Sequence, residues 1–260
     1  MTALTLRPAG STFRRIGGRE GHWHLHARRR DPAFPLAPDD DVVCPFDFFE
    51  VTGTQAEAAL AALCEAWPGK TPTLFGSPHE AGILFERRRN RAKSAEEWLI
   101  EADRFDLDVW LSLRAAEFAK HEEFPPRGPW PSEATTYRQL TVPFDILTDA
   151  PKPSVIIGLL PTSDPTETAA HLGFGGWNDC PAPPVHILLA RRWHERYGAV
   201  QVASTYETVE FRVSKPLADR DEALRLALEQ FYWCSDSVPE TLEHAAAELI
   251  GSTVWVFWWD

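Results

Sequence analysis

The chain has 260 residues, of which 44% are hydrophobic, and its formal net charge is −12 at pH 7. Domains usually run about 100–200 residues, so we expect two of them. The negative charge argues against nucleic acid as a partner, because binding phosphates requires a basic surface. No apolar run approaches the ~20 residues of a membrane-spanning helix and the N-terminus lacks an apolar signal core, so we expect a cytoplasmic protein without membrane contact.

Residues 1–40 are rich in Arg, Pro and Gly and predict an N-terminal arm with one short strand. His22, His24 and His26 alternate along it, so their side chains would share one face, with neighbours about 6.6 Å apart. Two of them could bind one metal ion, which makes this run the candidate metal site. The alternative is a packed or solvated strand that binds no metal. The chain contains no nucleotide-binding motif, and we expect no cofactor.

Residues 41–123 predict a smaller α/β region before the C-terminal half. Residue composition favours a strand over 42–51, a helix over 54–66 and a strand over 71–75. Helical spacing follows from residue 78 to residue 122.

Within this helical stretch, Ser94 and Glu97 form a capping box. Val109 and Leu113 are among the apolar side chains that we expect to point inward. The basic run Glu86–Arg91 is most simply a solvated helix face with acidic partners at Glu96 and Glu97, and anion binding is the alternative.

Residues 124–150 predict a proline-rich linker and lead-in, since four prolines fall between Phe124 and Ser132. In residues 151–260, Pro and Gly residues separate the expected elements more clearly, and the pattern predicts the order β-α-β-β-α-α-β. The expected elements are strand 155–160, helix 183–197, strands 200–204 and 208–213, helices beginning near Asp219 and Pro239, and strand 253–259. The fold class is therefore predicted as α+β, a sheet with helices packed against it.

Four separated motifs in the C-terminal half carry a resemblance to a known family. They are Gly176–Pro181, Arg192–Ala199, Glu229–Cys234 and Trp255–Asp260. In this order they resemble the bacterial domain-of-unknown-function 4253 family, from about Val155 to Asp260. The resemblance implies a fold unit without an established reaction. Such proteins usually have Pro or Asn where this chain has Ser235, which implies a reshaped loop there.

The glycine-rich loop Gly175–Pro181 is the candidate rim of a pocket or of a partner-binding surface, because loops often carry recognition. Either His186 or His194, both in the helix expected over 183–197, could meet Cys180 or Cys234 across the fold as a thiolate–imidazole pair. Packing in the core is the simpler explanation for these residues, and the four cysteines lack a CxxC pair, which fits reduced thiols. The candidate binding or pocket residues are Trp177, Asn178, Cys180, His186, Trp193, Cys234 and Trp258.

The chain lacks a complete catalytic set, and we do not expect an enzyme. The leading hypothesis is a non-catalytic protein-binding module, immunity-like or regulatory, of the kind that neutralises or regulates a partner. Its partner is an unidentified protein, for which a basic surface would fit the charge of −12. The alternative is an enzyme or small-molecule-binding protein with a pocket near the Gly175–Pro181 loop.

Overall fold

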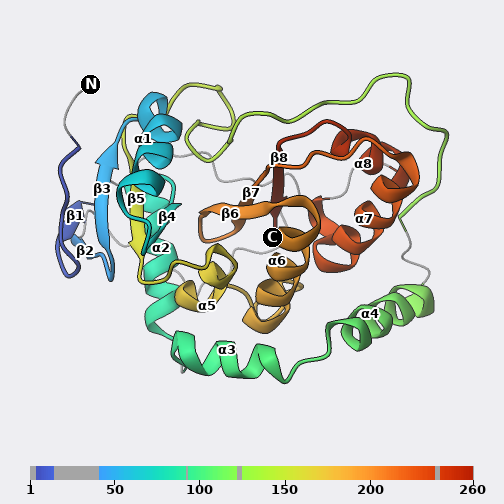
Figure 1. Ribbon diagram of the computed structural model, residues 1–260, viewed down its shortest axis with the longest axis horizontal. Coiled ribbons are helices and arrows are strands. Elements are labelled where there is room, and N and C mark those ends of the chain that lie inside the picture. The colour runs from blue at the N-terminus through green and yellow to red at the C-terminus, as the bar shows by residue number, and fades with distance from the viewer. Residues whose placement is uncertain (1–3, 15–40, 92, 122–124, 238–240, 260) are drawn as a thin grey trace.

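The computed structural model describes residues 4–14, 41–91, 93–121, 125–237 and 241–259 (Figure 1). The strands are β1 (Thr12–Arg14), β2 (Asp41–Val43), β3 (Asp47–Val51), β4 (Thr71–Leu74), β5 (Val155–Leu160), β6 (Ala199–Ser204), β7 (Thr208–Val213) and β8 (Val254–Trp258). The α-helices are α1 (Gly53–Ala66), α2 (Pro78–Arg89), α3 (Ala95–Asp103), α4 (Leu107–His121), α5 (Thr168–Leu172), α6 (Pro183–Tyr197), α7 (Arg220–Trp233) and α8 (Leu242–Leu249). None of the helices described here has both the length and the apolarity to cross a bilayer.

Six of the strands form one mixed sheet in the order β3-β5-β4-β6-β7-β8. Neighbours are antiparallel except β4 and β6, which run parallel. Both neighbours of β5 come from the first half of the chain, so this sheet interleaves strands of the expected N-terminal and C-terminal regions. β1 and β2 form a separate antiparallel pair. The α+β class predicted from the sequence is confirmed.

Local capping signals in the sequence locate several helix ends correctly. Ser94 Oγ accepts a hydrogen bond from the Glu97 amide, and the Glu97 carboxylate accepts one from the Ser94 amide at 2.7 Å, which forms the expected capping box. Asp219 caps α7 by accepting from the Glu222 amide at 2.8 Å. Gly198 ends α6 in the left-handed conformation, with φ of 59°.

The sheet separates two hydrophobic clusters. The adjacent β5 residues Ile156 and Ile157 belong to different clusters, and successive side chains of a strand point to opposite faces. Helix α1 covers one face, and the larger cluster on the other contains α6. At its centre Trp193 has no exposed surface. Four aromatic rings lie with centroids 5.1–5.8 Å from Trp193: Phe211, Trp233, Trp255 and Phe257.

Helices α3 and α4 lie end to end along one edge of the molecule, outside α5 and α6 (Figure 1). The inward face of α4 carries Leu107, Trp110 and Phe118, which follow helical spacing. Val109 and Leu113 fall on the opposite face and are 53% and 64% exposed. The expectation that these two side chains point inward is therefore wrong.

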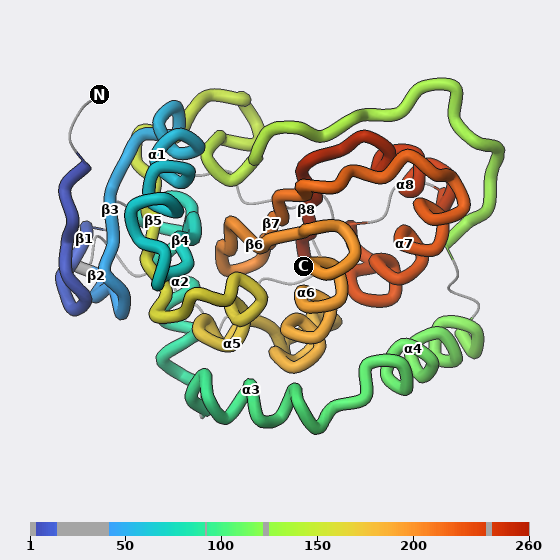
Figure 2. Tube along the Cα trace, in the orientation of Figure 1, coloured from blue at the N-terminus to red at the C-terminus, as the bar shows by residue number. Residues whose placement is uncertain are grey.

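The proline-rich stretch from residue 125 to residue 150 contains no helix or strand and runs from α8 to α1 (Figure 2). Hydrogen bonds fasten it to both ends of the fold. The Leu242 amide donates to Pro126 O at 3.0 Å, and the Leu140 amide donates to Glu57 Oε1 at 3.0 Å. The Tyr137 amide donates to Ser252 Oγ at 2.8 Å. The segment is therefore a hydrogen-bonded surface loop.

Candidate functional site

The glycine-rich loop between α5 and α6 is a tightly closed turn. The Gly176 amide donates to Pro181 O at 2.8 Å, and the Cys180 amide donates to Trp177 O at 2.8 Å. Gly175 has φ of 104°, and a Cβ there would lie 2.0 Å from Pro181 O, so no other residue fits. Asn178 sits at the exposed tip with φ of 43°, which Asn tolerates well.

The structure brings Cys180 and His186 into contact beneath this loop. His186 Nε2 lies 3.5 Å from Cys180 Sγ and 3.0 Å from Pro181 O. Because a carbonyl oxygen only accepts, Nε2 carries the proton and donates it to Pro181 O. It therefore cannot take the thiol proton of Cys180, which a nucleophilic pair requires.

Burial keeps these groups neutral. It lowers the pKa of His186 to about 3, raises the pKa of the Cys180 thiol far above its ordinary value, and raises the pKa of Cys234 to about 12. Cys234 Sγ is hydrogen-bonded to Trp258 O at 3.1 Å, at the end of β8. The rings of Phe174, Trp233 and Trp259 surround His186 with centroids 5.1–5.5 Å away. This arrangement is that of a packed core.

The remaining candidate residues differ in exposure. Trp193 is buried and donates its indole N–H to Glu229 Oε1 at 2.6 Å. Trp177 and Trp258 are half-buried. His22, His24 and His26 lie outside the described residues. Within the described ranges, no group of three metal-ligating side chains could hold an ion.

We expect the buried thiols to be unreactive in the folded chain. Cys64 is the exposed cysteine among the four, whereas Cys44, Cys180 and Cys234 are buried. Iodoacetamide should therefore alkylate Cys64 first and the other three after denaturation, because the thiolate is the reacting form. Peptide mapping by mass spectrometry would check this order. Alkylation of native Cys180 or Cys234 at the rate of Cys64 would revive the nucleophile hypothesis.

Three arginines at the end of α2 fasten it to the C-terminal half. Arg87 Nη1 donates to Tyr206 O at 2.7 Å, Arg88 Nε donates to His171 O at 2.7 Å, and Arg91 donates to Gly175 O. The interpretation of this basic run as a solvated face is therefore wrong. Sequence spacing could not reveal these partners, because they are backbone carbonyls more than 80 residues away.

Arg87 also covers two aromatic rings. Its Cζ atom lies 4.7 Å from the Trp177 centroid and 5.3 Å from the Tyr206 centroid, within the range of cation–π attraction. The Gly175–Pro181 loop and the β6–β7 turn are thus held against the same helix.

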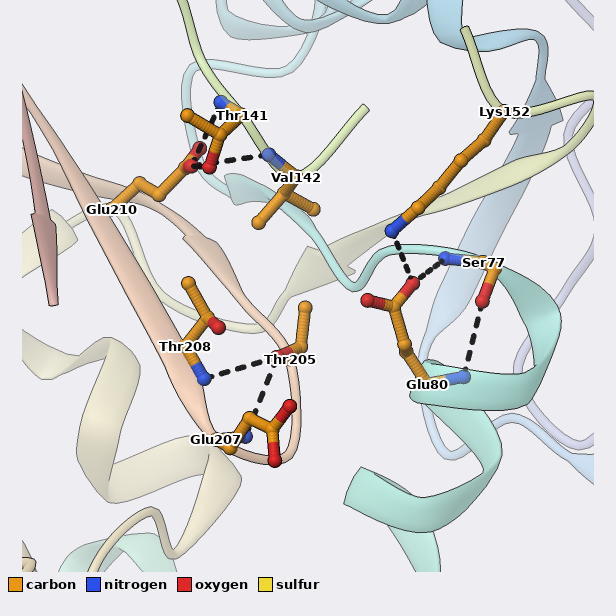
Figure 3. Close-up of polar contacts among 9 residues, drawn as sticks. All are labelled: Ser77, Glu80, Thr141, Val142, Lys152, Thr205, Glu207, Thr208 and Glu210. Atoms are coloured by element: carbon orange, nitrogen blue, oxygen red, sulfur yellow. Dashed lines mark hydrogen bonds and ion pairs between the residues drawn. The ribbon is translucent and has the colours of Figure 1, made fainter. Parts of the chain in front are cut away.

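Figure 3 shows the titratable side chains of Glu80, Lys152 and Glu207, which come from three segments of the chain, and Arg87 also acts on the charge of Glu207. Lys152 Nζ donates to Glu80 Oε2 at 2.6 Å, and the Ser77 amide donates to the same oxygen at 2.6 Å. Burial raises the pKa of Glu207, in the β6–β7 turn, to about 7, and the charge of Glu80 adds to this shift. Sequence reasoning missed this junction because its members are far apart in the chain.

Glu210 is a fully buried carboxyl group on β7 (Figure 3). Its Oε1 accepts from the amides of Thr141 at 2.8 Å and Val142 at 3.0 Å, and also from the Thr141 hydroxyl. Burial raises its pKa to about 7. Glu210 therefore anchors the segment 125–150 to the sheet and binds a proton near neutral pH.

The outer surface of the α3–α4 arm, residues 95–121, combines apolar and acidic side chains. Val109 and Leu113 are four residues apart and lie on one face of α4, with exposed Ala116 next along it. Ile100 on α3 is 45% exposed. The arm has seven carboxylates against three Lys and Arg side chains, a net charge of −4. Three of these carboxylates pair with cations outside the arm: Glu101 with Lys93, Asp103 with Arg191 and Asp108 with Arg192.

Comparisons with known proteins bear on the C-terminal half. No curated protein and no solved structure matches the chain. Residues 156–260, from β5 to the last residue, match the family model described as Domain of unknown function (DUF4253), which confirms the resemblance carried by the four C-terminal motifs.

Proposed function

We propose that the chain is a non-catalytic protein-binding module of the immunity-like or regulatory kind, and that its binding surface is the α3–α4 arm. The observation that carries this proposal is the exposed apolar stripe of Val109, Leu113 and Ala116 on α4. A helix that turns large aliphatic side chains outward leaves apolar surface that a partner can cover.

The acidic side chains of the arm favour a partner with a basic surface. Carboxylates lie beside the stripe, including that of exposed Asp106 at the start of α4. A partner that places an apolar patch on the stripe and basic side chains around it would match both features. An amphipathic helix with Lys or Arg beside its apolar face is the simplest such surface.

The alternative, a catalytic or ligand-binding pocket at the Gly175–Pro181 loop, has less support. Cys180, His186 and Cys234 are buried and neutral, and Arg87 packs against Trp177. A ligand would have to displace packed side chains to reach the thiols.

The proposal is tested with Val109→Gln, Leu113→Gln. Glutamine is polar, uncharged and a good helix former, so α4 should persist while its stripe is lost. The matched control is Ile146→Gln, Leu147→Gln, because these side chains are 58% and 63% exposed outside the arm. Each immobilised protein would capture partners from a lysate of the source organism, with circular dichroism to verify folding.

We expect one stoichiometric basic protein to be captured by the wild type and the control. The arm variant should lose it, and added salt should weaken capture, because exposed charges are screened. Equal capture by both variants would place the binding surface elsewhere. Capture of no stoichiometric protein by the wild type would contradict the proposed function.

A further inference from the structure

A surface pocket of about 510 Å³ lies between α6 and α7. Pockets that bind small molecules usually measure about 300–1,000 Å³, so its size is suitable. The last turns of α6 and the first turns of α7 form its walls. Its lining residues are Arg192, Arg196, Tyr197, Glu222, Arg225, Leu226 and Glu229.

One wall of the pocket is fixed by internal ion pairs. Arg192 Nη1 lies 2.8 Å from Glu229 Oε2, and Nη2 lies 2.5 Å from Oδ1 of Asp108 on α4. The second oxygen of Glu229 accepts the indole N–H of Trp193 at 2.6 Å. Glu229 is therefore satisfied from within the fold, and it is not available to neutralise another cation in the pocket.

The two other arginines of the pocket make no ion pair within the part of the chain that the structure describes, and Asp108, Glu222 and Glu229 together balance the charge of the three guanidinium groups. Arg196 and Arg225 are exposed, and neither makes an ion pair with any residue in the described ranges, while Arg196 is hydrogen-bonded to the side chain of Tyr197. Glu222 is the one opposing carboxylate that remains among the lining residues. Guanidinium groups present several donors in a plane, which suits a phosphate or carboxylate group.

The base of the pocket is less polar. Tyr197 and Leu226 line it with the small part of their surfaces that the fold leaves exposed, 6% and 2%. A ligand that reaches them gains from an apolar or aromatic body, while its anionic end stays with the arginines at the rim.

We propose that this pocket binds a small organic anion, with Arg196 and Arg225 holding its oxyanion group and Tyr197 and Leu226 contacting its apolar body. The site lies in the segment that matches the family model and is separate from the exposed face of the arm. It can therefore be right or wrong independently of the proposed protein-binding function.

Isothermal titration calorimetry of the full chain with phenyl phosphate and with inorganic phosphate tests the site. We expect phenyl phosphate to bind more tightly than phosphate, because the ring covers Tyr197 and Leu226. Arg196→Gln, Arg225→Gln should weaken phenyl phosphate binding by roughly tenfold or more, since each charge-assisted hydrogen bond contributes about that factor.

The matched control is Arg104→Gln, Arg138→Gln, which removes the same charge from exposed positions outside the pocket. It should bind phenyl phosphate as the wild type does. An equal loss in both variants would show non-specific charge attraction and overturn the proposal. No binding of either probe at millimolar concentrations would overturn it too, and equal affinity for the two probes would remove the role of Tyr197 and Leu226.

Discussion

A fragment of residues 151–260 expressed alone is expected to lack a cooperative unfolding transition. In the intact chain β5 pairs with β3 on one side and with β4 on the other, and the fragment contains neither neighbour. Val155, Ile157 and Leu159, each at most 2% exposed in the intact chain, would lose most of their cover, since their cluster is built mainly from residues before 151. Burying such side chains contributes about 1.5–3 kcal/mol each, so the loss approaches the whole stability of a typical domain, about 5–15 kcal/mol.

Thermal denaturation followed by circular dichroism, with the full chain as the control, would measure this. The sequence predicted a domain boundary near residue 151, and a domain that begins there would unfold cooperatively on its own. A sharp transition in the fragment would show that this region folds on its own and that β3 and β4 only extend its sheet.

Glu210→Gln is expected to stabilise the folded chain above neutral pH. Burial raises the pKa of Glu210 from 4.5 to about 7, so the folded chain retains a proton that the unfolded chain releases. The stability that this proton gives is complete below pH 4.5 and is lost as the pH rises through about 7. A pKa difference of this size corresponds to about 3 kcal/mol.

The glutamine keeps a carbonyl oxygen where Oε1 accepts from Thr141 and Val142, and it carries no ionisable proton. Urea denaturation should therefore find the variant about 3 kcal/mol more stable than the wild type at pH 8.5, with a much smaller difference at pH 5. The difference in unfolding free energy between the two proteins reports on Glu210 alone. His186, whose pKa is lowered, destabilises both proteins equally at acidic pH, so its contribution cancels. A difference that is the same at both pH values would contradict this account.

Local sequence signals predicted where helices begin and end better than they predicted which strands lie next to one another in the sheet. The caps at Ser94 and Asp219 and the end of α6 at Gly198 depend on a few adjacent residues, and each was located correctly. The position of β4 between β5 and β6 depends on pairing over about 80 or more residues. No periodicity within one strand encodes that choice.

The inward side of α4 was assigned wrongly for a related reason. Its sequence offers two apolar stripes, and Leu107, Trp110 and Phe118 rather than Val109 and Leu113 face the fold. Helical spacing identifies stripes, but tertiary contacts decide which stripe is covered.

At the candidate site, too, the sequence indicated which residues matter but not their tertiary surroundings. Of the histidine–cysteine pairs that the sequence left open, the structure brings together His186 and Cys180. Its chemistry was not readable from sequence, because the shifts in pKa come from burial by rings distant in the chain. The junction of Glu80, Arg87 and Glu207 was not predicted, because its members also lie far apart in the chain.

Hydrogen exchange of the chain, alone and bound to a captured partner, tests the protein-binding account most directly. We expect slower exchange in the complex for amides of α3 and α4, with the strongest protection around Val109 and Leu113. Amides of the sheet should change little, since they are already buried. Protection confined to other surfaces, with α3 and α4 unchanged, would contradict the claim that the arm is the binding surface.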